Sequence, residues 1–419
     1  MKYKTIKGTH DILPNKIENW QLLEKKIHSV CNLFSFKEIR TPIIEESKLF
    51  SRSVGENSDI VSKEMYTWKD IDGKSITLRP EYTAPVVRSF IQHNLGANSA
   101  TQRFYYLGSL FRRERPQKGR QRQFNQFGIE AFGSHHPEQD VEVISVGWKI
   151  LEELGLNKGL SLKINSLGSK DCRELYRDSL KKFIRPNLEH FSITSQNRFK
   201  TNPLRILDSK SESDKNLLKH GPQVSDYYSK EDQIHFDEIQ KYLKELKIPF
   251  LIDNHLVRGL DYYTRTTFEI TSDALGAQDA ILGGGRYDHL VENLGGKPTP
   301  AVGFAAGIER VLLSIESQGI NNNKKNIDVY FACIDSLGLS VSLSLSNKLR
   351  NLGISVLMDT LRRSIKAQLR EANKSGAKYA IIVGEAEIKN NEAIVKDLQN
   401  GTQMKVPQSK LINKLSGLI

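Results

Sequence analysis

The sequence predicts a mixed α and β fold in two parts, and three observations point to it. Strand-like runs and amphipathic helices both occur up to about residue 320. An Asn- and Lys-rich run at residues 321–326 then has the composition of a linker. After this run strands and helices alternate, which is typical of a small α/β domain with crossover connections. We therefore expect one domain at residues 1–326 and a second at residues 327–419.

Length and composition are those of a globular protein with more than one domain. The 419 residues can form two or three cores, and 38% of them are hydrophobic and 26% charged. No stretch approaches the ~20 apolar residues of a membrane span, and residues 1–14 lack the apolar core of a signal peptide. Cys31, Cys172 and Cys333 lie far apart, without metal-ligand spacing, and suit a reducing cytoplasm. The net charge of +12 favours a polyanionic partner, although many basic proteins bind none.

The first domain opens with an amphipathic helix, because apolar residues recur there at three- and four-residue steps. These residues are Ile17, Trp20, Leu23, Ile27 and Val30. A short strand around Ile39 follows and ends at Pro42. From residue 75 to residue 166, strand-like runs alternate with helices near residues 84–93 and 138–154.

The composition of the first domain changes after residue 167 and again at residue 248. Residues 168–247 are polar and charged, without clear strands, and predict an inserted, mainly helical module. Strand signals return from Phe250 and are strongest at residues 266–270, which are rich in β-branched and aromatic side chains. We expect a final helix from Ala305 to Ile315.

The second domain is a basic α/β unit. Its predicted strands are residues 329–334, 354–358 and 379–383, and its predicted helices are residues 339–352 and 364–374. It carries 13 Lys and Arg residues against 8 Asp and Glu residues, a net charge of +5. Four basic side chains cluster on and just before the second helix: Arg362, Arg363, Lys366 and Arg370.

The densest chemical signal is the segment from Phe111 to Phe124. Six of its residues are basic, and Pro116 and Gly119 predict a turn in the middle. A hairpin carrying guanidinium groups suits phosphate, because their planar forks bind phosphate oxygens in pairs. The alternative is a basic loop that only faces water.

The strand that follows this hairpin separates into two faces. One face, with Phe127, Ile129 and Ala131, is apolar and should lie on the core. The other places Gln126 and Glu130 on either side of Gly128, and a glycine inside a strand often marks the close approach of a ligand. These side chains could also simply face water. Their place directly after the basic hairpin favours the floor of a pocket.

Other clusters are weaker when taken alone. Residues 78–83 end a strand and enter a helix, so their polar residues could be helix caps. Residues 258–265 could form a polar turn with packed tyrosines. The glycines of residues 283–288 match neither a dinucleotide fingerprint nor a P-loop. In residues 305–310, Arg310 could be a surface ion pair or reach a ligand.

Taken together and in order, these segments resemble the class II aminoacyl-tRNA synthetases. Residues 40–45 (RTPIIE), 111–124 and 303–310 (GFAAGIER) look like motifs 1, 2 and 3 of that class. Residues 79–83 (RPEYT) and 256–264 (LVRGLDYYT), with the opening KGTHDILP, narrow the resemblance to histidyl-tRNA synthetases. It covers nearly the whole chain and is weakest in the insertion. Tyr82 stands where many members have glycine.

The resemblance implies a fold and an activity. The fold would be α+β: an antiparallel-sheet catalytic core with a helical insertion touching the tRNA acceptor arm, and a C-terminal α/β domain that binds the anticodon. The enzyme would be a cytoplasmic homodimer, associated through motif 1 and not with a membrane. It would activate L-histidine with ATP and Mg²⁺ to histidyl-adenylate and pyrophosphate, then transfer histidine to the 3′ end of tRNA(His).

The resemblance also implies roles for individual residues. Arg112 and Arg258 would be catalytic, acting on the carboxylate and the α-phosphate. The ATP-binding residues would be Arg112, Glu114, Phe124, Arg258 and Arg310. The histidine-binding residues would be Glu81, Tyr82, Thr83, Gln126, Glu130, Tyr262, Tyr263 and Tyr287. The tRNA-binding residues would be Gln117, Lys118 and Arg120 at the acceptor end and Arg362, Arg363, Lys366 and Arg370 at the anticodon. The protein would have no dedicated metal site of its own.

Two rival interpretations have to be weighed. The regulatory subunit of ATP phosphoribosyltransferase resembles the same core but lacks the anticodon-binding tail and has lost catalytic residues. Here Arg112, Arg258 and Arg310 are all present, and so is the tail. The other rival is a synthetase-like accessory protein that only binds nucleic acid, and the complete set of pocket residues argues against it.

Overall fold

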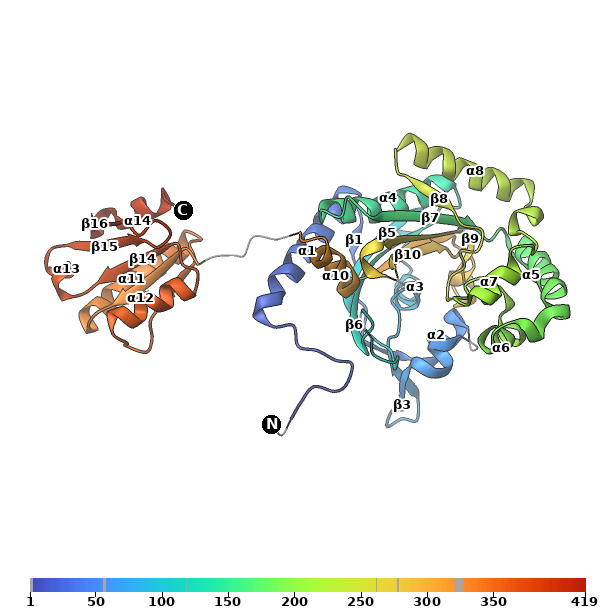
Figure 1. Ribbon diagram of the computed structural model, residues 1–419, viewed down its shortest axis with the longest axis horizontal. Coiled ribbons are helices and arrows are strands. Elements are labelled where there is room, and N and C mark those ends of the chain that lie inside the picture. The colour runs from blue at the N-terminus through green and yellow to red at the C-terminus, as the bar shows by residue number, and fades with distance from the viewer. Residues whose placement is uncertain (1–2, 56–57, 118, 261, 277–278, 321–326) are drawn as a thin grey trace. The chain divides into compact units, whose positions relative to one another are not determined.

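The computed structural model describes residues 3–55, 58–117, 119–260, 262–276, 279–320 and 327–419. The chain separates into two compact units, Met1–Asn321 and Asn322–Ile419 (Figure 1). Each has its own sheet and its own buried core. Within these described ranges, no helix has the length and apolar character needed to cross a membrane.

The first unit is built on an eight-stranded sheet in the order β1-β5-β6-β11-β10-β9-β7-β8. Its strands are β1 (Lys37–Glu38), β5 (Gln102–Phe111), β6 (Gln123–Phe132), β7 (Leu160–Ser166), β8 (Phe250–Ile252), β9 (Thr264–Ser272), β10 (Ala280–Arg286) and β11 (Ala301–Gly307). The six central strands pair antiparallel, and only the edge strands β1 and β8 pair parallel to their neighbours. The predicted α+β class with a largely antiparallel sheet is therefore confirmed.

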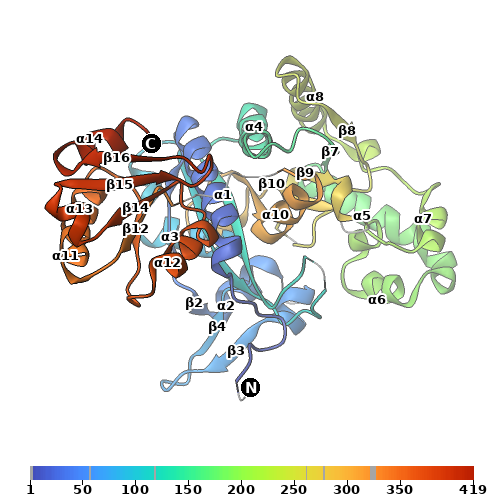
Figure 2. The same cartoon turned by 60° about the vertical axis from the view of Figure 1, so that its left-hand side comes forward.

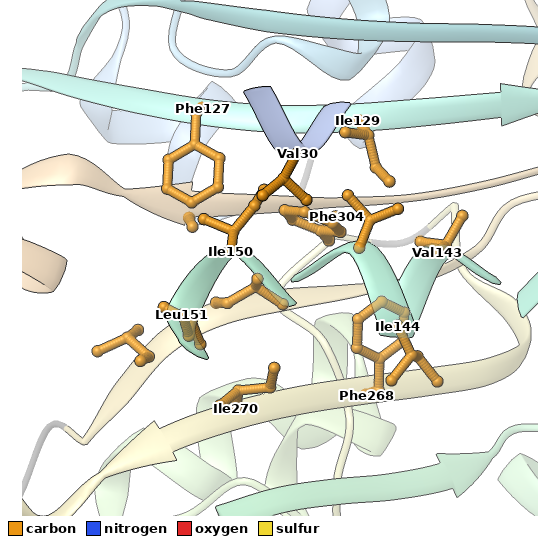
Figure 3. Packing of buried hydrophobic residues seen from close by; sticks show 14 of the residues in the cluster. Val30, Phe127, Ile129, Val143, Ile144, Ile150, Leu151, Phe268, Ile270 and Phe304 are labelled. Atoms are coloured by element: carbon orange, nitrogen blue, oxygen red, sulfur yellow. The ribbon is translucent and has the colours of Figure 1, made fainter. Parts of the chain in front are cut away.

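One face of this sheet carries the main hydrophobic core. The covering helices are α1 (Pro14–Leu33), α4 (Pro137–Glu153), α8 (Lys230–Glu245) and α10 (Ile308–Ser317). Figure 3 shows Val30 and Ile150 of the helices near Phe127 and Phe304 of the sheet, and Ile144 near Phe268. The apolar face predicted for residues 124–132 lies in this core, since Phe127, Ile129 and Ala131 are buried there.

The opposite face holds a second, more aromatic cluster. It combines α3 (Thr83–Gln92) and the short α9 (Leu290–Asn293) with Tyr106 and Phe132 of the sheet. Because side chains alternate along a strand, Glu130 of β6 points to this face while Ile129 points to the main core. Buried polar residues gather on this face, and the candidate site is here.

Smaller elements flank this face. A three-stranded antiparallel sheet has the order β2-β4-β3, with β2 (Ile44–Glu46), β3 (Tyr66–Lys69) and β4 (Ser75–Leu78). It is accompanied by α2 (Ser47–Val54) and by η1 (Ile60–Glu64), and η2 (Leu95–Ala97) follows α3.

The region predicted as an insertion is helical. It contains α5 (Lys170–Ile184), η3 (Arg185–His190), α6 (Ile193–Thr201), η4 (Pro203–Ile206), α7 (Glu212–Leu218), η5 (Val224–Tyr227) and α8. Figures 1 and 2 show α5, α6 and α7 gathered at one end of the first unit. The buried side chains from Cys172 to Val224 form a small core of their own, whereas Phe236, Ile239 and Leu243 of α8 join the main core.

The second unit is an α/β domain with a five-stranded sheet in the order β13-β12-β14-β15-β16. Its strands are β12 (Val329–Cys333), β13 (Val356–Met358), β14 (Tyr379–Val383), β15 (Glu392–Asp397) and β16 (Gln403–Pro407). Its helices are α11 (Ser336–Asn351), α12 (Ile365–Lys374), α13 (Glu385–Lys389) and α14 (Gln408–Ser416). The predicted crossovers are present as three parallel strands, and β15 and β16 extend the sheet antiparallel.

One predicted element begins in the wrong place. The expected helix from Ala305 is a strand as far as Gly307, and α10 begins only at Ile308. The small residues there do not start a helix, because they pair with β6: Ala305 lies opposite Gly128 and Ala306 opposite Phe127. The short 3-10 segment η6 (Asp273–Leu275) was not predicted.

Candidate functional site

Two neighbouring cavities share lining residues on the aromatic face of the main sheet. The inner one has a volume of about 210 Å³ and the outer one about 720 Å³. Arg112, Gln126 and Arg258 line both. A small compartment with several tyrosines thus lies beside a larger compartment rich in charge.

The inner cavity brings together a set of residues that are distant in the sequence. Its lining includes all eight residues predicted to bind histidine: Glu81, Tyr82, Thr83, Gln126, Glu130, Tyr262, Tyr263 and Tyr287. They come from the entry to α3, from β6, from the segment before β9 and from the end of β10.

Glu130 is the most deeply placed carboxyl group of this cavity, with only 1% of its surface exposed. One oxygen, Oε1, accepts hydrogen bonds from the Thr83 hydroxyl at 2.7 Å and the Tyr106 hydroxyl at 3.3 Å. The other, Oε2, accepts a hydrogen bond from the Tyr287 hydroxyl. Gly303, directly opposite on β11, leaves room for the carboxyl group, because a Cβ there would collide with Oε2.

Glu81 is held by the backbone at the start of α3. Its two oxygens accept hydrogen bonds from the N–H groups of Thr83 at 2.7 Å and Ala84 at 2.9 Å. These donors have no partner within the helix, so the carboxyl group acts as a cap. Glu81 therefore caps α3, as the alternative interpretation of this segment predicted, and it also lines the inner cavity.

Burial changes the acidity of both carboxyl groups. Burial raises the pKa of Glu130 to about 8, and the nearby Glu81 raises it further, against the hydrogen bonds from Tyr287 and Thr83. Burial raises the pKa of Glu81 to about 7, against its backbone hydrogen bonds and the charge of Arg112. A cavity with two such groups is suited to a cationic ligand or to one that donates hydrogen bonds.

The expectation that Gly128 admits a ligand was wrong in its physical reason. Gly128 lies directly opposite Tyr106 on β5, and a Cβ there would collide with the Tyr106 hydroxyl and the Phe304 carbonyl oxygen. The glycine therefore accommodates a tyrosine ring of the protein itself. Tyr106 lies between Gln126 and Glu130 in the cavity lining, and no sequence motif had pointed to it.

Tyr287 is positioned by a buried ion pair beside it. Arg286, fully buried, binds the Asp140 carboxylate of α4 and donates to the carbonyl oxygen of Ser134 at 2.8 Å. Asp288, on the other side of Tyr287, accepts from Arg286 at 3.1 Å. Because both neighbours of Tyr287 are tied down, its hydroxyl is aimed at Glu130.

The outer cavity collects the five residues predicted to bind ATP: Arg112, Glu114, Phe124, Arg258 and Arg310. The Arg112 guanidinium carbon lies 5.3 Å from the centre of the Phe124 ring, and its Nε donates to the Pro80 carbonyl oxygen at 2.8 Å. Glu114 forms ion pairs with Arg120 at 2.9 Å and with Arg112 at 3.6 Å.

Arg258 lies where the two cavities adjoin and is held by Glu269 of β9 at 2.5 Å. Its guanidinium group lies against Gly283, where a Cβ would collide with three of its atoms. Gly283, the first glycine of a run that matches no nucleotide motif, thus leaves space for this arginine. Coulombic attraction from Tyr263 and Glu269 raises the pKa of Arg258 against the effect of burial.

The basic residues predicted to bind tRNA fall into two groups. In the hairpin, Gln117 and Arg120 form an isolated backbone bridge, Arg120 also lines the outer cavity, and Lys118 lies outside the described residues. In the second unit, Arg362, Lys366 and Arg370 are exposed. Arg363 is instead bound to Asp359 at 2.6 Å and Glu371 at 3.3 Å, so it braces the loop before α12.

The lining also contains residues that were not foreseen. The inserted module contributes Arg198 of α6, Arg205 of η4 and Lys210 of the loop before α7 to the outer cavity. Arg205 forms an ion pair at 2.9 Å with Asp59, which precedes η1. Only their basic character was visible in the sequence, because nothing local indicates which face of a helix closes over a distant cavity.

Metal ligands are not grouped in the parts of the chain that the structure describes. No cluster of three or more His, Cys, Asp or Glu side chains there could hold a metal ion. Glu309, a carboxylate of the outer cavity, accepts hydrogen bonds from the Asn125 amide groups at 2.8 and 3.0 Å.

Comparisons with known proteins agree with this arrangement. Residues 8–311 match the family model described as histidyl-tRNA synthetase, and residues 328–418 match the anticodon binding domain.

Individual relatives match over almost the whole length. The chain is 45% identical over 409 residues to a histidine–tRNA ligase of Natranaerobius thermophilus, covering 97% of each. It superposes on an apo histidyl-tRNA synthetase of S. aureus with a TM-score of 0.84, at 36% identity, covering 99% of each chain. An ATP phosphoribosyltransferase regulatory subunit/histidyl-tRNA synthetase of Bacillus halodurans has a similar fold, with a TM-score of 0.67 at 22% identity over 91% of this chain and 98% of that one.

Proposed function

The chain belongs to the histidyl-tRNA synthetase family and is a histidine–tRNA ligase, and from this premise we propose how its two cavities divide the reaction. Histidine occupies the inner cavity and ATP the outer one. The observation that carries the proposal is Glu130, a buried carboxyl group surrounded by the hydroxyls of Thr83, Tyr106 and Tyr287.

Glu130 accepts the imidazole N–H, while Glu81, Thr83 and Gln126 take the ammonium group. A carboxylate is the strongest acceptor that a pocket can direct at a ring N–H. Gln126 and Glu130 share one face of β6, four residues and therefore ~13 Å apart along the strand. Both line the inner cavity, so their side chains can contact opposite ends of histidine. Tyr262, Tyr263 and Tyr287 enclose the ring, and Tyr82 completes the lining.

Activation joins the histidine carboxylate to the α-phosphate of ATP and releases pyrophosphate. Arg112 and Arg258 line both cavities, so they can hold the two reacting groups together and stabilise the charge that develops between them. Phe124 stacks on the adenine, Glu114 accepts from its amino group, and Arg310 binds the triphosphate. Histidine then passes from the adenylate to the 3′ end of the tRNA, near Gln117, Lys118 and Arg120.

Magnesium fits the outer cavity as an ion carried by the nucleotide. Mg²⁺ is usually held by phosphates and one or two carboxylates, so it needs no protein cage. Glu64 lines this cavity, and burial, followed by the proximity of Glu114, raises its pKa. A cation would relieve the repulsion between the Glu64 and Glu114 carboxylates, so we assign Glu64 as the carboxylate that binds Mg²⁺. The ion would neutralise the departing pyrophosphate.

We expect Glu130→Gln to raise the Michaelis constant for histidine at least ~10-fold, since the loss of a hydrogen bond to a charged group costs about 1.5–3 kcal/mol. Steady-state pyrophosphate exchange, with histidine and ATP varied separately, measures this. The Michaelis constant for ATP should stay within about twofold, because Glu130 does not line the outer cavity.

The pH dependence provides the control for this variant. With a pKa of about 8, Glu130 is largely protonated in the empty cavity at pH 7, and it must ionise to become the charged acceptor of a hydrogen bond from the ring N–H. The Michaelis constant for histidine should therefore fall in the wild type as pH rises from 7 to 8.5, and fall less in Glu130→Gln. Unchanged histidine kinetics in the variant would contradict the assignment of the inner cavity.

We also propose a homodimer formed through residues 40–45. Ile43 and Ile44 are 45% and 49% exposed there, and apolar surface of this kind suits an isologous contact. Light scattering at micromolar concentration should give twice the chain mass of 47.6 kDa. Ile44→Glu should shift the protein towards monomer, whereas Ile71→Glu, at a fully exposed turn, should not. A stable wild-type monomer would refute the proposal.

The cell compartment that we propose is the cytoplasm. All three cysteines are free and buried, as expected in a reducing environment.

A further inference from the structure

Three glycines of the main sheet each leave room for a side chain that lines the inner cavity. Gly303 makes room for Glu130 and Gly128 for Tyr106, each directly across a strand pair. Gly108 does the same for Tyr82, since a Cβ there would lie 2.6 Å from the Tyr82 hydroxyl oxygen. The three side chains therefore follow one another across the sheet.

Tyr82 is the outermost of the three and is 2% exposed. Its ring stacks on the Tyr106 ring, with centroids 4.0 Å apart and planes inclined by 8°. Its hydroxyl donates to the Leu107 carbonyl oxygen at 3.2 Å. The polar end of Tyr82 is thus bound to the strand, and its ring meets Tyr106.

The other face of the Tyr82 ring is covered by Arg79, whose guanidinium carbon lies 3.9 Å from the ring centre. Arg79 is itself fixed, because it donates to the carbonyl oxygens of Thr41 at 2.7 Å and Ser109 at 3.0 Å. A cation over an aromatic ring adds attraction to this packing. The stack therefore has a rigid outer end.

The inner end of this stack reaches Glu130, the residue proposed to bind the imidazole ring of histidine. Tyr106 is held between the Tyr82 ring on one side and the backbone of Gly128 on the other. In this position its hydroxyl donates to Glu130 Oε1 at 3.3 Å, the oxygen that Thr83 also binds. If Tyr82 were absent, the Tyr106 ring could tilt into the vacated space and withdraw its hydroxyl from Glu130.

We propose that Tyr82 is a positioning residue for histidine specificity, acting through Tyr106 to fix the orientation of Glu130. The inference rests on the proposed function, since it takes Glu130 as the residue that binds the imidazole. Besides its place in the lining of the inner cavity, Tyr82 would thus have a task that needs no contact with the substrate.

The first test compares Tyr82→Leu with Tyr82→Phe. Leu removes the stacked ring, and the Michaelis constant for histidine in pyrophosphate exchange should rise about tenfold, the effect of one misplaced hydrogen bond. The Michaelis constant for ATP and kcat should stay within about twofold. Phe keeps the ring and loses only the hydroxyl, so it should restore the histidine value to near the wild type. A merely structural role would instead lower the active fraction or raise both Michaelis constants.

The second test keeps Tyr82 but crowds its side chain. If Tyr82→Leu does not fold, this test alone decides whether Tyr82 positions Glu130. Gly108→Ala would crowd the Tyr82 hydroxyl at 2.6 Å and Arg79 Nη2 at 2.8 Å. The histidine Michaelis constant should rise several-fold. Adding Tyr82→Phe should recover part of the loss, because the hydroxyl is then gone while Arg79 is still crowded.

Two outcomes would overturn the inference. One is a histidine Michaelis constant within twofold of the wild type in folded Tyr82→Leu, or in Gly108→Ala. The other is an equal rise in both Michaelis constants. If Glu130→Gln is impaired while these variants are normal, only this inference fails. If Glu130→Gln is normal as well, the proposed histidine site fails with it.

Discussion

Arg258→Ala is expected to lower kcat for histidine activation by about 10²–10³-fold, the usual loss when one fixed donor to a developing charge is removed. Arg258 lines both cavities, is held by Glu269 at 2.5 Å and lies against Gly283. It can therefore stabilise the transition state without first reorganising. Single-turnover formation of the adenylate measures the effect apart from product release.

Two comparisons make this prediction specific. Arg258→Lys keeps a positive charge beside Glu269 but loses the planar fork, so most of the loss should persist. Arg103→Ala removes another ion-paired arginine, bound to Glu142 at 2.8 Å and outside both cavities, and should leave activation unchanged. A kcat within about fivefold of the wild type in Arg258→Ala would remove this residue from the catalytic step.

Deletion of residues 327–419 is expected to leave pyrophosphate exchange within about threefold while reducing tRNA charging about 100-fold or more. The second unit has its own core, and the two cavities are lined entirely by the first unit. The truncated protein should therefore still activate histidine. Losing only two charge-assisted contacts to tRNA, at about 1.5–3 kcal/mol each, accounts for a 100-fold effect.

Substitutions in the full-length chain test the exposed basic residues of the second unit directly. Lys366→Ala with Arg370→Ala should weaken tRNA binding and reduce its salt dependence, because both side chains are exposed and counterion release scales with phosphate contacts. Lys405→Ala removes a lysine already paired with Glu392 at 2.7 Å and should change little. Charging by the truncated protein at the full-length rate would refute the anticodon role proposed for this domain.

The sequence predicted the polar side of the site because that side follows a strand period. Gln126 and Glu130 alternate with buried Phe127 and Ile129, so the two-residue period alone was enough to place them on a common face. Tyr106 could not be found in this way, because it lies in an apolar run and its role depends on the register that places it opposite Gly128.

Other features were missed as well, and most of them depend on contacts between residues that are distant in the sequence. Arg198, Arg205 and Lys210 reach the outer cavity only because the inserted helices fold over it. Strands β15 and β16 were missed although the Asn400-Gly401 pair between them is a hairpin signal. Ala305 and Ala306 were assigned to a helix because small residues fit either structure, and their pairing with β6 and β10 decides between the two.

The amino-acid dependence of pyrophosphate exchange by the full-length protein tests the account most directly. With ATP and Mg²⁺, exchange should require histidine. An analogue of similar shape without a ring N–H should be rejected by about 10⁴-fold, because the Glu130 carboxylate would then lack the ring donor. Exchange that proceeds equally well with such an analogue, or with an unrelated amino acid, would contradict the account.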